Sequence, residues 1–223
     1  CFAACTGVPQ ARVHEDAGIG DAGSEAQPPG MQGWRLAWAV RAGGDDGVGY
    51  NFIREGGVDL AALDDGSVYV AGCAADGTVF GPGEANETVF PVDSGLNDGF
   101  LARYNADGTL SWARRIGGTE PDCAHGVAAL ADGSAAVVGF FDSPEVLLGE
   151  GEPNETVLAG NGSPGHDNSF VARYSPDGDL AWAVLIPRDD DRCVTAFTVD
   201  PLPDGRLLVG GYFEGVVWPG EET

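Results

Sequence analysis

A block of seventeen residues occurs twice in the chain. Residues 100–116 and 170–186 start seventy positions apart, and they are identical at ten of the seventeen positions. Repetition at a fixed spacing of this size is typical of stacked supersecondary units, each of which covers the apolar face of its neighbour. The repeat therefore constrains the architecture strongly, whereas it says little about a ligand or a reaction.

Further blocks obey the same spacing. One block contains an Asp-Gly pair between apolar runs and occurs three times, at residues 58–72, 127–139 and 197–211. Another reads Gly-Glu-x-Asn-Glu-Thr-Val and occurs twice, at residues 83–90 and 151–158. Fragments of these blocks recur near both ends of the sequence, at residues 36–44 and 219–223. The chain thus holds the tail of one repeat, two full repeats and the opening of another.

Each repeat is predicted to form four strands in two hairpins. Asp-Gly accepts the positive φ of a tight turn, so its recurrence between apolar runs is a strong hairpin signal. The strand after the first turn is almost continuously apolar, which indicates burial on both faces, and the outer strands alternate. No helical periodicity occurs in the repeats. We therefore expect an all-β fold: a partial β-propeller of antiparallel sheets, with about two complete four-stranded blades and parts of two more.

Composition excludes some partners. The chain has 223 residues with 36 Gly and 14 Pro, and its formal net charge is −24. Such an acidic surface repels phosphates, so we expect binding neither to nucleic acid nor to anionic headgroups. Clustered carboxylates could instead bind a cation. No stretch approaches the ~20 apolar residues of a membrane-spanning helix.

The first part of the chain differs from the rest. Residues 1–32 are predicted to form an N-terminal segment with a disordered acidic Ala/Gly/Asp linker, and residues 33–223 the repeats. The sequence before and including Cys5 resembles the lipobox of a bacterial lipoprotein signal, and Cys1 could itself be the first mature residue. We favour lipidation of Cys5 or Cys1, in which case the lipid anchor would be the only contact of the protein with the membrane. The alternative is an ordinary linker or the remnant of a signal peptide.

The large aromatic residues of the repeats are expected to pack between sheets rather than stack on a ligand, because each can bury ~150–250 Å². These residues are Trp38, Trp112, Trp182, Phe100, Phe170, Tyr104 and Tyr174.

Three further cysteines lie in the repeats. Cys123 and Cys193 are read as occupying like positions in successive repeats, and Cys73 follows another strand. In an exported protein one disulfide among them is reasonable, either Cys73–Cys123 or Cys123–Cys193. Buried free thiols are the alternative.

Candidate chemistry is sparse. No nucleophile elbow, phosphate loop or His-Glu-x-x-His helix occurs, so no catalytic residue is predicted. The charge run Asp189, Asp190 and Asp191 is most simply explained as a solvated loop. Together with Asp122 it could instead surround one mouth of a propeller and hold Ca²⁺, although no complete twelve-residue calcium loop occurs. No other cofactor is predicted.

The sequence Asp98-Gly-Phe-Leu-Ala-Arg-Tyr104, followed by Asp107-Gly108, Leu110, Trp112 and Gly117-Gly118, resembles the bacterial seven-bladed β-propeller repeat family. The resemblance covers about residues 33–223. Arg103 and Arg173 stand where the family has Lys, and Asn168 where it has Asp. The Gly-x-x-x-Trp spacing is also similar to the docking motif of quinoprotein propellers. The resemblance implies an exported propeller, frequently a lipoprotein, without established catalytic residues.

These observations favour a surface-tethered, non-catalytic β-propeller that acts as a binding or scaffold module for a protein or glycan. Its contacts are expected in the long excursions at residues 75–99 and 142–169. The location would be the cell envelope, as an outer-membrane lipoprotein, or extracellular. The alternative is a propeller enzyme (a hydrolase, lyase or quinoprotein) whose active residues lie in blades not present here. Because closed propellers have 4–8 blades, we expect the chain to be a fragment, and the alternative is an open array that is capped by another subunit.

Overall fold

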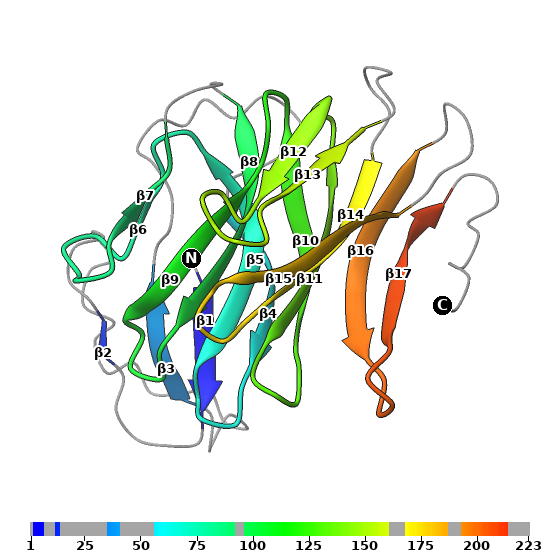
Figure 1. Ribbon diagram of the computed structural model, residues 1–223. Helices are drawn as coiled ribbons and strands as arrows, with labels where there is room; N and C mark the ends of the chain where they lie inside the picture. Colours follow the sequence, from blue (N-terminus) through cyan, green and yellow to red (C-terminus); the bar gives the residue numbers. More distant parts are fainter. Residues whose placement is uncertain are drawn as a thin grey trace.

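The computed structural model describes residues 56–91, 96–160, 168–186 and 193–212 in full, and residues 2–6, 12–13, 35–40 and 213 as backbone strand only. The regular secondary structure in these ranges consists entirely of β-strands (Figure 1). Within the same ranges there is no helix of the length and hydropathy needed to cross a membrane. The prediction of an all-β fold is confirmed.

Two sheets have the same topology, with four antiparallel strands paired in chain order. The strands of the first sheet are β4 (Gly56–Ala62), β5 (Val68–Ala75), β8 (Asn97–Tyr104) and β9 (Leu110–Ile116). Those of the second sheet are β10 (Asp122–Ala129), β11 (Ala135–Phe141), β14 (Asn168–Tyr174) and β15 (Leu180–Ile186). A third pair consists of β16 (Val194–Pro201) and β17 (Leu207–Phe213).

The Asp-Gly turns form in the way that the sequence predicts. Gly66, Gly133 and Gly205 have φ values of 83°, 82° and 86°, in the region that favours glycine. In each turn the Asp side chain accepts a hydrogen bond from the backbone amide two residues later, at 2.9–3.1 Å. The recurring Asp-Gly pair therefore fixes both the turn and the register of its hairpin.

The second strand of each complete sheet is its central buried element. Every residue of β11 is buried, and so is all of β5 except its last residue. A strand buried on both faces explains why these segments are almost continuously apolar. The first strands β4, β10 and β16 each contain a β-bulge at the same place, where Val58, His125 and Phe197 are the extra residues of these strands.

The sheets lie side by side in chain order (Figure 1), with β10 against β4 on one side and β16 on the other. Glycines permit very close approach where these strands meet. A Cβ on Gly126 in β10 would lie 2.6 Å from the carbonyl oxygen of Phe197 in β16. A Cβ on Gly99 in β8 would lie 3.0 Å from the backbone nitrogen of Ala124 in β10. The backbone of β10 is therefore in close contact with β16 of the next sheet on one side and with β8 of the preceding sheet on the other.

Between its second and third strands each complete sheet carries a small hairpin. The hairpin of the first sheet is β6 (Val79–Phe80) with β7 (Thr88–Val89), and that of the second is β12 (Glu145–Leu148) with β13 (Thr156–Ala159). The second hairpin also bridges to the first sheet between Gly117 and Leu147. Its apolar side chains Val146, Leu148 and Leu158 belong to the core between the two sheets.

A separate three-stranded sheet comprises β1 (Phe2–Thr6), β3 (Arg35–Val40) and β2 (Arg12–Val13), with β3 in the middle. The strands β1 and β2 fall within residues 1–32, where the sequence predicts a disordered linker. The rest of that segment lies outside the described residues, so the boundary at residue 32 stays a prediction.

Candidate functional site

The contact between the first two sheets centres on Trp112, whose side chain is only 6% exposed. The indole nitrogen donates a hydrogen bond to the carbonyl oxygen of Pro176 at 2.9 Å. A Cβ on Gly178 would lie 2.7 Å from the indole ring. Pro176 and Gly178 form the turn between β14 and β15, so Trp112 of the first sheet packs on a turn of the second. Only glycine leaves room for the ring at this turn.

Arg103 reaches the same turn from β8. Its Nη1 donates to the carbonyl oxygen of Pro176 at 2.9 Å, and its Nη2 donates to the hydroxyl of Ser67 at 3.2 Å. Nη2 also lies 3.4 Å from Oδ2 of Asp65. Hydrogen bonds from the hydroxyl and amide of Ser67 lower the pKa of Asp65, and the charge of Arg103 lowers it further. One guanidinium thus joins the turn between β4 and β5 to a turn of the next sheet.

Two more side chains of the first sheet reach acceptors on the second. The hydroxyl of Tyr69 donates to the carbonyl oxygen of Gly133 at 2.5 Å. Arg114 Nε donates to the carbonyl oxygen of Gly178 at 2.9 Å and to Oε1 of Glu152 at 3.2 Å. The interface therefore combines an apolar core with directed hydrogen bonds at the Asp-Gly turns.

The second tryptophan of the repeated block has a different environment. Trp182 occupies in β15 the position of Trp112 in β9, because each lies opposite the corresponding arginine of the preceding strand. Its side chain is 37% exposed, and the nearby Val184 is 51% exposed. Burial of Trp182 between sheets, which the sequence predicts, does not occur in the described structure. Among the described residues, β16 is followed only by β17, so nothing corresponds there to the turn that covers Trp112.

Four of the remaining aromatic residues that we expected to pack between sheets are in the interior. Phe100, Phe170, Tyr104 and Tyr174 are at most 1% exposed. The side chain of Trp38 lies outside the described residues.

The Gly-Glu-x-Asn-Glu-Thr block holds the outer strand of each sheet. Oε2 of Glu84 accepts a hydrogen bond from the backbone nitrogen of Leu110 at 2.6 Å, and Asn86 Nδ2 donates to the carbonyl oxygen of Leu110 at 3.2 Å. In the second sheet Glu152 and Asn154 make the same two contacts with Leu180. The sequence shows that this block repeats, but it does not reveal this role, because Glu84 and Leu110 are far apart in the chain.

Asp122 is a fully buried carboxylate at the start of β10. It accepts hydrogen bonds from the backbone nitrogens of Gly118 (2.7 Å), Asp142 (3.1 Å) and Ser143 (3.3 Å), and from the hydroxyl of Ser143 (2.8 Å). Burial raises the pKa of Asp122 to about 7, although the bonds from Ser143 and Gly118 oppose the rise. Asp98 raises it further. Asp98 itself pairs with Arg115 at 2.5 Å.

These contacts bear on the predicted calcium site. Asp122 holds together the chain segments around it rather than lying at an open mouth. Asp189, Asp190 and Asp191 lie outside the described residues. In the part of the chain that the structure describes, no three His, Cys, Asp or Glu residues are grouped in a way that could hold a metal ion. Calcium binding stays a prediction.

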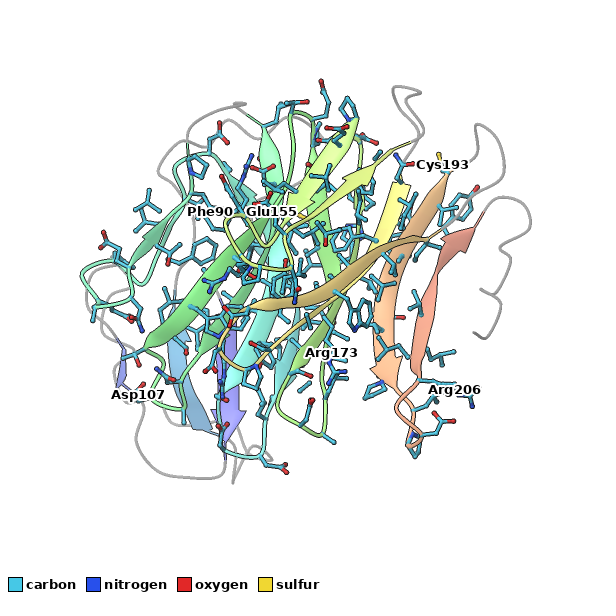
Figure 2. All side chains as sticks on the ribbon, viewed as in Figure 1. Phe90, Asp107, Glu155, Arg173, Cys193 and Arg206 are labelled. Atoms are coloured by element: carbon cyan, nitrogen blue, oxygen red, sulfur yellow. A yellow bond between two sulfur atoms is a disulfide. The ribbon has the colours of Figure 1, made fainter. Side chains whose placement is uncertain are left out.

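The structure contains one of the two disulfides considered above, Cys73–Cys123, which joins β5 of the first sheet to β10 of the second. Cys193, which is partly buried and lies just before β16 (Figure 2), is not part of a disulfide. The side chains of Cys1 and Cys5 lie outside the described residues, so lipidation of either one stays a prediction.

The strand register corrects one reading of the sequence. Phe140 is opposite Cys123, and the corresponding pair in the third unit is Tyr212 with Thr195. Cys193 therefore does not occupy the position of Cys123. The match of Cys193 with Cys123 rests on residue type alone. Counting back from the Asp-Gly turns, which have equal lengths, matches Cys123 with Thr195 instead.

A shallow groove of about 510 Å³ lies at the boundary between the two sheets. Its lining is mostly polar and comes from the β6–β7 hairpin, from β9 and from the β14–β15 turn. The lining residues are Asn86, Glu87, Thr88, Ser111, Trp112, Arg114 and Asp177. The polar side chains that line the groove are open to solvent. Two of the lining residues, Trp112 and Arg114, already make hydrogen bonds across the contact between the sheets.

No family model matches the chain. Over 149 residues the chain is 32% identical to the protein named Regulatory protein FlaEY from Caulobacter vibrioides. The aligned part is 66% of this chain and 14% of that protein. The similarity therefore concerns a small segment of a much longer protein.

Proposed function

We propose that the repeats form part of a β-propeller. The first strands β4, β10 and β16 are in close contact, with room only for glycine at Gly126. At the outer strands the hairpin β12–β13 lies between the sheets, with β12 in contact with β9 and β13 in contact with β15. Sheets that are close at one edge and spread at the other are rotated about an axis near the close edge. This wedge supports a radial arrangement of blades.

We infer that the function is that of a non-catalytic binding or scaffold module. The observation that carries this proposal is the use of the recurring polar side chains. Arg103 and Arg173 both bind the preceding Asp-Gly turn, and Glu84 and Glu152 both bind an outer strand. The repeated charged positions thus support architecture. In a propeller of this kind, the segments between the strands would determine which partner is bound.

The inserted hairpins are the best candidates for partner contact. Val89 and Val157 occupy equivalent positions in β7 and β13, and they are 56% and 55% exposed. Exposed apolar side chains at the same place on successive repeats favour an extended surface for a protein or glycan.

Site-specific photo-cross-linking on the native cell tests this proposal. A photoreactive residue at Val157 should capture one discrete partner, whereas the same residue at Asp107, which lies in a turn between β8 and β9 (Figure 2), should capture none. Equal capture from both positions, or none from either, would contradict a module that binds through its inserted hairpins.

The proposal includes tethering to the cell envelope through a lipid on Cys5 or Cys1. Incorporation of labelled palmitate should be lost in one of the variants Cys5→Ser and Cys1→Ser, and it should persist in Cys193→Ser. Labelling that survives both N-terminal substitutions would exclude this anchor.

A further inference from the structure

Two equivalent tryptophans have unequal surroundings, and this difference identifies an incomplete surface. Trp112 is 6% exposed because the Pro176–Gly178 turn covers it, whereas Trp182 is 37% exposed. The inner part of the same face is covered: Val171 is buried, and Leu207 and Val209 of β17 pack in its cluster. The uncovered part of the second sheet is therefore confined to its outer strand.

Beside this exposed surface lies the edge of β17 that has no partner strand among the described residues. In the complete sheets, β5 pairs with β4 and β8, and β11 pairs with β10 and β14. Among the described residues, β17 pairs with β16 alone. An unpaired strand edge presents a row of backbone donors and acceptors that can pair with a further strand. In Figure 1 β16 and β17 lie beside β14, at the end of the stack.

We propose that the edge of β17 and the face around Trp182 bind a β-hairpin of the repeat's own third and fourth strands, contributed by a further tandem repeat. This inference rests on the proposed stacking of repeats. The established contact between the first two sheets specifies the occupant. Its third strand pairs antiparallel with β17, as β14 does with β11. Its turn carries glycine at the position of Gly178.

The chemistry of the surface agrees with this occupant. Arg173 already binds Asp132 and Ser134 in its own sheet, as Arg103 binds Asp65 and Ser67. Arg103 has a further bond to the carbonyl oxygen of Pro176 in the next sheet. The incoming turn would supply the corresponding carbonyl oxygen to Arg173. Trp182 would receive the turn glycine against its ring.

Extension of the full chain tests the proposal. A copy of residues 168–186 is joined to the C-terminus through a flexible Gly-Ser linker, with Phe in place of the copied tryptophan. Hydrogen exchange of the β17 amides should slow by roughly tenfold or more. A fluorine resonance from 5-fluorotryptophan at Trp182, assigned with Trp182→Phe, should lose its solvent isotope shift.

The matched control is the same extension with Val in place of its turn glycine, which leaves no room for the Trp182 ring and should restore the exposed signal. An extension that changes neither β17 nor Trp182 overturns the proposal. Concentration-dependent protection of β17 in the unextended chain also overturns it, because the occupant is then a second copy. If Gly178→Ala fails to weaken the existing sheet contact, the proposed stacking itself falls instead.

Discussion

At the scale of single residues, sheet stacking depends on the fit of one large ring to one glycine. Trp112 fills the space above Gly178, and its indole nitrogen is satisfied by the carbonyl oxygen of Pro176. A buried indole N–H without a partner is unfavourable, so the hydrogen bond and the apolar contact support the same geometry. The positive φ of 89° at Gly178 adds a second reason for glycine.

Gly178→Ala should destabilise the protein more than the matched substitution Gly205→Ala. Both glycines have positive φ, so each substitution costs about 1 kcal/mol in backbone strain. A Cβ at Gly205 meets nothing within 4 Å, whereas one at Gly178 would overlap Trp112. We expect about 2–4 kcal/mol of destabilisation for Gly178→Ala in urea unfolding. Equal losses for the two variants would show that Trp112 does not depend on the turn.

Asp122 should make stability depend on pH above 5. Its folded pKa is raised from 3.8 to about 7, so the folded state binds more protons than the unfolded state between these values. The free energy of unfolding should therefore increase as the pH falls from 8 to 5, by at most about 1.4 kcal/mol per unit below 7. Asp122→Asn should lose this slope, whatever its absolute stability. Parallel pH profiles for the two proteins, measured by urea unfolding, would exclude this role.

At the scale of elements, the outer strand of each sheet is held by a side-chain clamp as well as by its ladder. Strand β9 pairs only with β8 in the first sheet. Glu84 and Asn86 bind both backbone groups of Leu110, at the beginning of that strand. A hydrogen bond to a charged acceptor contributes about 1.5–3 kcal/mol, so the clamp counters fraying at an edge.

Removal of the clamp should loosen β9 locally. In Glu84→Ala the amide of Leu110 should exchange roughly ten- to hundredfold faster, because it loses a charge-assisted bond. Glu150→Ala removes the same charge from an exposed position and should leave the rate unchanged. Residue-resolved NMR exchange provides the measurement. Uniform acceleration across β8 and β9 would instead indicate global destabilisation.

The elements were predictable where a local signal determines them. The Asp-Gly turns and continuous apolar runs located the hairpins of both sheets, because positive φ and double burial each leave a mark in a few consecutive residues. The exposure of Trp182 was not predictable, because the two similar sequence blocks place their tryptophans alike and differ in what covers them. The Glu84 clamp joins residues distant in sequence, and the buried position of Asp122 depends on the packing of several loops. Such long-range contacts leave no local mark in one sequence.

At the scale of the whole molecule, successive sheets are joined by packing, by turn-to-side-chain hydrogen bonds and by one covalent link. The apolar core between the first two sheets includes Tyr69, Leu101, Phe170 and Tyr174. The disulfide lies beside this core and joins β5 to β10. The second sheet and the pair β16–β17 have no corresponding covalent link among the described residues, because Cys193 is in no disulfide. Their contact depends on apolar packing and on bonds such as that from Ser169 to the carbonyl oxygen of Val194.

Loss of the disulfide should therefore weaken the joint between the first two sheets. The link closes a loop with a sequence separation of 50 residues, for which the chain-entropy relation gives about 4 kcal/mol, with 2–5 kcal/mol typical of small domains. The double variant Cys73→Ala/Cys123→Ala should lose a free energy of unfolding in this range, and wild type with reductant should approach the same value. Cys193→Ala should match wild type within about 0.5 kcal/mol in oxidising buffer. Urea unfolding followed by tryptophan fluorescence measures all four samples. If the double variant equals wild type, removing the cross-link does not measurably raise the conformational entropy of the unfolded chain. Packing and hydrogen bonds alone then determine the stability of the joint.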